Sequence, residues 1–91
     1  MKVKMDEIAC LPGLGQKSAA MLERAGIRSV SQLRALGSVR AYTMVRDAGI
    51  AVSLNLLWAL EGGLTGERWQ DVARLHRTSL LMALDSASRS G

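Results

Sequence analysis

Apolar side chains recur at helical spacing along most of this chain, and glycine or serine separates one apolar group from the next. Ala19, Leu22 and Ala25 lie three residues apart, which places them on one face of a helix. Gly26 follows, and glycine commonly ends a helix because it adopts the left-handed conformation readily. The pattern therefore predicts a helix over residues 16–25.

Serine and glycine also delimit two predicted helices in the middle of the chain. A short helix ends at Gly37, and either Ser29 or Ser31 can cap its start by accepting a hydrogen bond from a first-turn N–H group. Ser38 is the expected cap of a second, amphipathic helix over residues 39–48.

The segment over residues 53–61 is apolar on nearly every side of a helix. A helix of this kind is enclosed by its neighbours, so we expect it to lie at the centre of the core. The glycine pair that follows is expected to end it. A last helix is predicted from Asp71 or Arg74 to Ser86.

Together these segments predict an all-α single domain of five to six helices. Ninety-one residues are too few for two lobes with a cleft between them, which excludes two-domain enzymes. Aromatic residues make up only 3% of the chain, which favours helices over a strand-rich sandwich. We expect residues 1–10 to form an extension with a first short helix, residues 11–86 the domain, and residues 87–91 a flexible tail. The expected core and structural residues are Leu14, Leu22, Tyr42, Asn55, Leu57, Trp58, Glu61 and Trp69.

Positive charge is concentrated in the first half of the chain. Residues 1–46 hold eight Lys and Arg side chains against three acidic ones, a net charge of +5, whereas residues 47–91 have a net charge of −1. A surface that contacts phosphate is therefore expected in the first half. A solvated basic surface without a ligand explains the same charge equally well.

The chemistry of several function classes is missing from the sequence. One cysteine, Cys10, and one histidine, His76, form no metal-ligand cluster, and no catalytic motif is present, so we expect no metal, no cofactor and no enzyme activity. His76 is interpreted as a surface residue. The N-terminus lacks the apolar run of a secretory signal and no segment is long enough to cross a membrane, so a cytoplasmic protein is predicted.

The segment over residues 11–18, LPGLGQKS, matches the turn of a helix-hairpin-helix element. Such a turn leads directly into a helix N-terminus, where unpaired backbone N–H groups and the positive end of the helix dipole favour an anion. The two glycines permit positive φ and let a phosphate approach the main chain. The candidate nucleic-acid-binding residues are Gly13, Gly15, Gln16, Lys17, Arg24 and Arg28.

The same residues also have a purely structural interpretation, in which the hairpin only turns one helix against another and Leu14 fills the core. Asn55 is interpreted as a buried amide that holds a loop, and Glu61 as a partner of a loop or an arginine. Trp58 and Trp69 could stack on bases, but the core interpretation is preferred for both.

The chain resembles the C-terminal domain of the TfoX/Sxy competence-regulator family over about residues 9–84. The resemblance rests on Leu14-Gly15-Gln16-Lys17-Ser18, Met21-Leu22, Gly26-Ile27, Leu33 with Leu36-Gly37, Ala41-Tyr42, the run SLNLLWALEG over residues 53–62, and Leu64, Gly66 and Trp69. It implies a helical, helix-hairpin-helix-like domain, of the SAM-domain-like orthogonal type, in bacterial regulators of competence genes that act as coactivating partners of a transcription factor.

Two features differ from the family pattern. Family members carry an α/β domain ahead of this one, whereas about ten residues precede the hairpin here, and Gln16 stands where proline is common.

Two hypotheses follow for a non-enzymatic regulatory module. The first is weak, sequence-independent contact with a DNA backbone through the hairpin. The second is a protein-interaction domain for a transcription factor, another regulatory chain or a second copy, without direct nucleic-acid binding.

Overall fold

The computed structural model describes residues 8, 11 and 14–90, and within this part of the chain every regular element is helical. The helices are α1 (Gln16–Arg24), α2 (Val30–Leu36), α3 (Ser38–Asp47), α4 (Leu54–Thr65), α5 (Trp69–Leu75) and α6 (Arg77–Ser90). The prediction of an all-α domain is confirmed. The predicted helix within residues 1–10 lies almost entirely outside the described residues.

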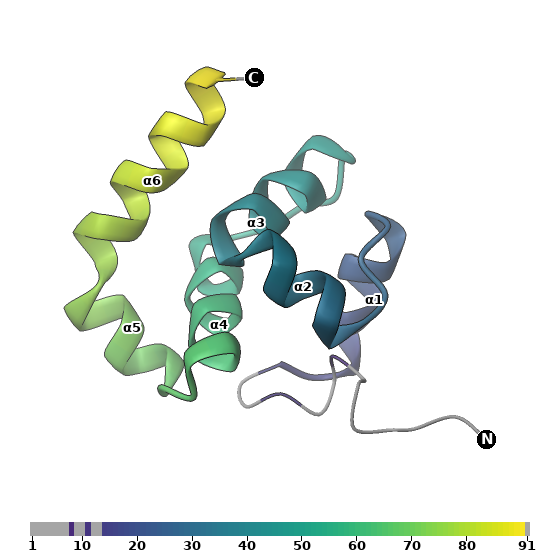
Figure 1. Cartoon of the computed structure of the whole chain (residues 1–91), viewed down its shortest axis with the longest axis horizontal. Coiled ribbons are helices and arrows are strands. Elements are labelled where there is room, and N and C mark those ends of the chain that lie inside the picture. Colours follow the sequence, from purple (N-terminus) through teal and green to yellow (C-terminus); the bar gives the residue numbers. More distant parts are fainter. Residues whose placement is uncertain (1–7, 9–10, 12–13, 91) are drawn as a thin grey trace.

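Helix α4 lies at the centre of the fold, with α3 on one side and α5 on the other (Figure 1). Five consecutive side chains of α4, residues 56–60, are buried, as expected for a helix that is apolar on all sides. Helix α6 packs on α3, and α1 lies on the opposite side of the molecule from α6. No described helix is both long enough and apolar enough to span a bilayer.

The predicted end of α4 at residue 61 is wrong, because the helix continues through Gly62 and Gly63 to Thr65. It ends at Gly66, whose φ of +85° is in the left-handed region. Gly62 is required for a different reason. A Cβ atom at this position would lie 2.6 Å from the Glu67 carbonyl oxygen, so the missing side chain lets the following loop rest directly on α4.

The last predicted helix is in fact two helices. Helix α5 begins at Trp69, two residues before the earliest predicted start, and ends before His76. Helix α6 begins at Arg77 and continues to Ser90, beyond the predicted end at Ser86. The break at His76 changes the chain direction, so that α5 can pack on α4 while α6 packs on α3.

Ser29, and not Ser31, caps α2, since its hydroxyl accepts a hydrogen bond from the Gln32 N–H at 3.1 Å. The predicted role of Ser38 is wrong. The cap of α3 is Gly37, at φ +85°, and Ser38 is the first helical residue. Its buried hydroxyl instead donates to Glu61 Oε1 at 2.7 Å, which joins the start of α3 to the middle of α4.

The core draws on every helix and on the segment before α1. Ile8, ahead of that helix, is 4% exposed, and Val72 and Leu80 are buried from α5 and α6. Five of the residues expected in the core are buried there: Leu14, Leu22, Tyr42, Leu57 and Trp58. The remaining three expected positions, at residues 55, 61 and 69, lie nearer the surface.

Candidate functional site

The first turn of α1 is exposed at the surface and carries backbone donors that lack an acceptor among the described residues. Gly15 is the N-cap, no side chain caps this end, and the first turn contains no acidic residue. The first helical bond runs from the Ala19 N–H to the Gly15 carbonyl at 2.9 Å. The amides of Gln16, Lys17 and Ser18 have no acceptor within the described part of the chain. Such an end favours an anion.

Gly15 does not use the positive φ that glycine permits, because its φ is −117° and its ψ is −169°, an extended conformation open to any residue. A Cβ atom at Gly15 would meet nothing within 4 Å, so the space in front of the cap is open. Gly13, the other glycine of the predicted hairpin, lies outside the described residues.

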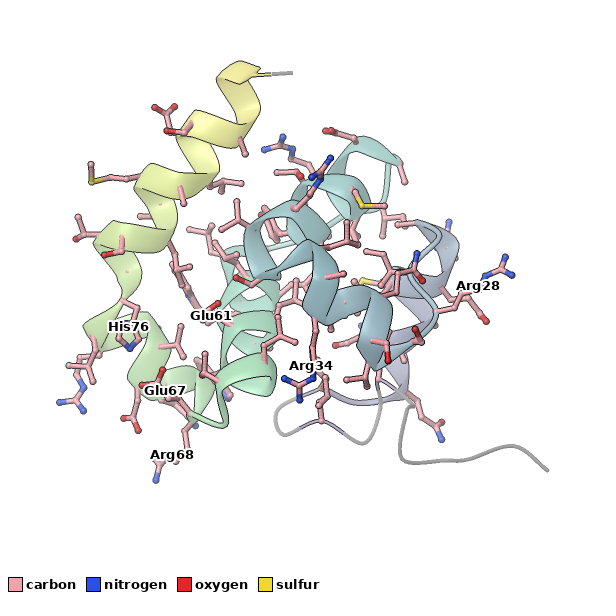
Figure 2. All side chains as sticks on the ribbon, in the orientation of Figure 1. Arg28, Arg34, Glu61, Glu67, Arg68 and His76 are labelled. Atoms are coloured by element: carbon pink, nitrogen blue, oxygen red, sulfur yellow. The ribbon has the colours of Figure 1, made fainter. Side chains whose placement is uncertain are left out.

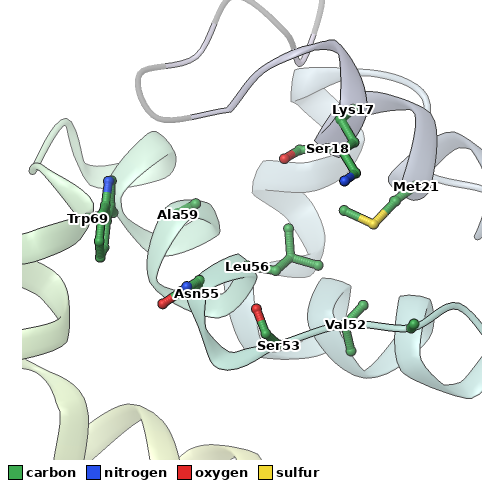
Figure 3. A pocket seen from close by; sticks show the side chains of 10 residues that line it. Lys17, Ser18, Met21, Val52, Ser53, Asn55, Leu56, Ala59 and Trp69 are labelled. Carbon is green, nitrogen blue, oxygen red and sulfur yellow. The ribbon is translucent and has the colours of Figure 1, made fainter.

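A cleft of about 380 Å³ lies beside this turn (Figure 3). Three segments that are distant in the sequence form it: the start of α1, the loop and first two turns of α4, and the first residue of α5. The lining residues are Lys17, Ser18, Met21, Ala51, Val52, Ser53, Asn55, Leu56, Ala59 and Trp69. The sequence patterns did not identify this cleft.

A second helix N-terminus borders the same cleft. Ser53 is the N-cap of α4, its side chain makes no capping bond, and the first turn of α4 also lacks acidic residues. Among the lining residues Lys17 is the only charged one. The cleft therefore combines one cation with the positive ends of two helices and has no carboxylate to compete with a bound anion.

Two residues expected in the interior line this cleft instead. Trp69 is 40% exposed, because it begins α5 at the corner where the chain leaves α4. Asn55 is exposed in the first turn of α4, before the fully enclosed part of that helix begins, and its amide has no partner in the described residues. The interpretation of both side chains as buried structural residues is therefore wrong.

The structure divides the predicted basic group into two parts. Gly15, Gln16 and Lys17 lie together at the start of α1, whereas Arg24 is in its last turn. Arg28 follows in the next loop (Figure 2). Lys17 and Arg24 are seven residues apart, which places them on nearly the same face, about 10 Å apart along the helix axis. A hydrogen bond of 2.9 Å from the Arg28 N–H to Gln32 Oε1 holds the loop that carries Arg28.

Two side-chain contacts away from the cleft link distant parts of the fold. His76 lies at the surface, as expected, with its side chain 42% exposed. Its Nε2 atom lies 3.1 Å from Glu67 Oε2 (Figure 2). Glu61 is half-buried and bound to Ser38. Within the described residues, no three His, Cys, Asp or Glu side chains gather where they could hold a metal ion, and Cys10 lies outside that part of the chain.

This chain was compared with known proteins in sequence and in structure. The chain is similar to a crystal structure of an uncharacterized protein from Listeria monocytogenes, with a TM-score of 0.76 and 27% sequence identity over 89% of this chain and 92% of that one. No curated protein matches significantly. The model of the TfoX C-terminal domain matches residues 4–84, which include all of the lining residues of the cleft. This protein therefore belongs to the TfoX C-terminal domain family.

Proposed function

We propose that this domain binds the backbone of nucleic acid through the first turn of α1, without reading the base sequence. One observation carries the proposal: the three amides at residues 16–18, which have no acceptor among the described residues, lie at an open helix end that carries Lys17 and lacks acidic residues in its first turn. Phosphate groups suit this arrangement because they accept hydrogen bonds from the amides and are attracted by the cation.

The face of α1 that carries Lys17 extends the contact. Arg24 lies about 10 Å further along this face, a distance equal to the rise of about three base pairs along the axis of B-form DNA. Arg28 follows in the next loop. Because these residues neutralise only a few phosphates, we expect weak binding with a shallow salt dependence.

Fluorescence anisotropy of a labelled 20-base-pair duplex tests this proposal. The affinity should fall between 50 and 200 mM salt, and Lys17→Glu should lower it further and reduce the salt slope by about one. Arg77→Glu is the matched control, since it changes the charge by the same amount at an exposed position on α6, on the far side of the molecule from α1. Equal losses for the two variants would show only the effect of net charge and would contradict the proposal.

Exposed apolar side chains favour a second candidate function, a protein-interaction domain. Leu75 and Met82 are 61% and 67% exposed on α5 and α6, on the side of the molecule away from α1. Such residues are common in protein interfaces. Light scattering across a range of protein concentrations tests self-association, and Met82→Lys should abolish it. A monomer at every concentration would exclude a second copy as the partner.

A further inference from the structure

We propose that the cleft between α1, α4 and α5 holds one unpaired nucleotide, with its base against Trp69 and its phosphate at the first turn of α1. This inference rests on the proposed function, since it assigns the phosphate to the same turn. It adds a ligand class, single-stranded nucleic acid, and two residues that contact the base.

The size and lining of the cleft suit this ligand. Its volume of about 380 Å³ is at the lower end of the range of roughly 300–1,000 Å³ found for small-molecule sites. The lining is mainly apolar with a few polar groups, among them the hydroxyls of Ser18 and Ser53. A nucleotide needs such a mixture, because its base is flat and largely apolar on its faces while its edge and phosphate are polar.

Trp69 provides a stacking surface at one end of the cleft. The tryptophan is 40% exposed, whereas Trp58 is 4% exposed and belongs to the core. The backbone of Trp69 lies against α4, since its nitrogen is 3.4 Å from the point where a Cβ of Gly62 would be. An aromatic side chain has only two torsions, so an exposed ring on such a backbone can stack on a base with little loss of side-chain freedom.

Asn55 lies between the two ends of the cleft. Figure 3 shows Trp69 at one end, Lys17 with Ser18 at the other, and Asn55 between them. The Asn55 amide offers both a donor and an acceptor and has no partner in the described residues. It can therefore bond to the edge of a base whose phosphate is bound near Lys17.

A single strand and a duplex should differ in how they bind. In a duplex every base is stacked and paired, so only the backbone contact at α1 is available. A single strand can also place a base on Trp69. The wild-type protein should therefore bind a single-stranded oligonucleotide of ten thymidines more tightly than a duplex at the same salt concentration.

Anisotropy titrations with these two probes test the inference. Trp69→Leu should weaken oligonucleotide binding by about five- to a hundredfold and leave duplex binding unchanged. Trp69→Phe should keep much of the affinity, and Asn55→Leu should reduce it. Thr78→Ala is the control, because it trims an exposed side chain on α6 that does not line the cleft. Thermal melting shows whether each variant is folded.

Tryptophan fluorescence supplies a test that needs no variant. Iodide should quench the exposed Trp69 and not the buried Trp58, and the oligonucleotide should protect Trp69. Thymidine monophosphate in place of the oligonucleotide separates a free nucleotide from a strand. Equally tight binding of the monophosphate would overturn the assignment to a strand.

Two further outcomes separate this inference from the proposed function. If Trp69→Leu binds the oligonucleotide as the wild type does, while Lys17→Glu still weakens duplex binding, the backbone contact stands and the nucleotide in the cleft is wrong. If neither probe binds at low salt, both proposals are wrong.

Discussion

The Ser38 side chain bonds to a distant residue, although its position in the sequence is typical of a helix cap. The residue follows Gly37 at the start of a helix, which is the usual place of a serine cap. Its hydroxyl nevertheless donates a hydrogen bond to Glu61, 23 residues further along the chain. Local patterns predict local bonds, so a long-range bond of this kind appears only in the folded structure.

Replacement of Ser38 tests the strength of this bond. Ser38→Ala should lower the free energy of unfolding by about 1–3 kcal/mol, because the half-buried Glu61 carboxylate loses its donor. Urea denaturation measures this change, and Ser79→Ala at an exposed position of α6 is the control. A loss below about 0.5 kcal/mol, the usual size of a surface effect, would show that water replaces the serine at no cost.

Burial was predictable for some residues and not for others. Leu22 lies on the apolar face of an amphipathic helix and Leu57 lies in a helix that is apolar on nearly every side, and both patterns predict the full burial that is observed. Asn55 lies within an apolar run and Trp69 is a large aromatic residue, so both are expected in the interior. Asn55 lies in the first turn of α4 and Trp69 is the first residue of α5, and both helix ends border the open cleft, which apolar spacing alone does not reveal.

At the scale of the helices, glycine has two different uses in this protein. Gly37 and Gly66 adopt positive φ beside the ends of helices, as the sequence pattern suggests. Gly62 lies inside α4, where glycine normally weakens a helix. It is there because the backbone of Glu67 passes too close for a side chain.

Substitution of Gly62 should therefore reverse the ordinary effect of alanine. In an open helix, Gly→Ala stabilises by roughly 0.5–1 kcal/mol. Gly62→Ala should instead lower the stability by about 1–3 kcal/mol, since the contact at 2.6 Å is with backbone and the loop has to move. Thermal melting gives the sign, and the emission of Trp69 reports the displaced loop. A higher melting temperature would contradict this account of the glycine.

The break between α5 and α6 was not predictable from apolar spacing. Val72 and Leu80 are both buried and eight residues apart, a spacing that one continuous helix also allows. The chain turns at His76, which is neither glycine nor proline. Packing against two different helices, α4 and α3, favours the turn, and a pattern within one segment does not contain that information.

At the scale of the whole molecule, the fold brings together three segments that the sequence keeps apart. The hairpin motif indicated the start of α1 correctly as an uncapped helix end. The cleft beside it needs residues near 17, 53 and 69 at once. The one charged residue that lines the cleft, Lys17, comes from the basic first half of the chain, as the charge distribution along the sequence predicts.

The central claim is that nucleic acid binds at the first turn of α1 and at the adjoining cleft. The most direct test is a two-dimensional ¹⁵N NMR titration of the full chain with the ten-residue thymidine oligonucleotide. The account predicts the largest shifts at the amides of Gln16, Lys17 and Ser18 and at the indole N–H of Trp69, with the signals of α6 unmoved. Shifts confined to the face of α6 that carries Met82, or no shifts at low salt, would contradict it.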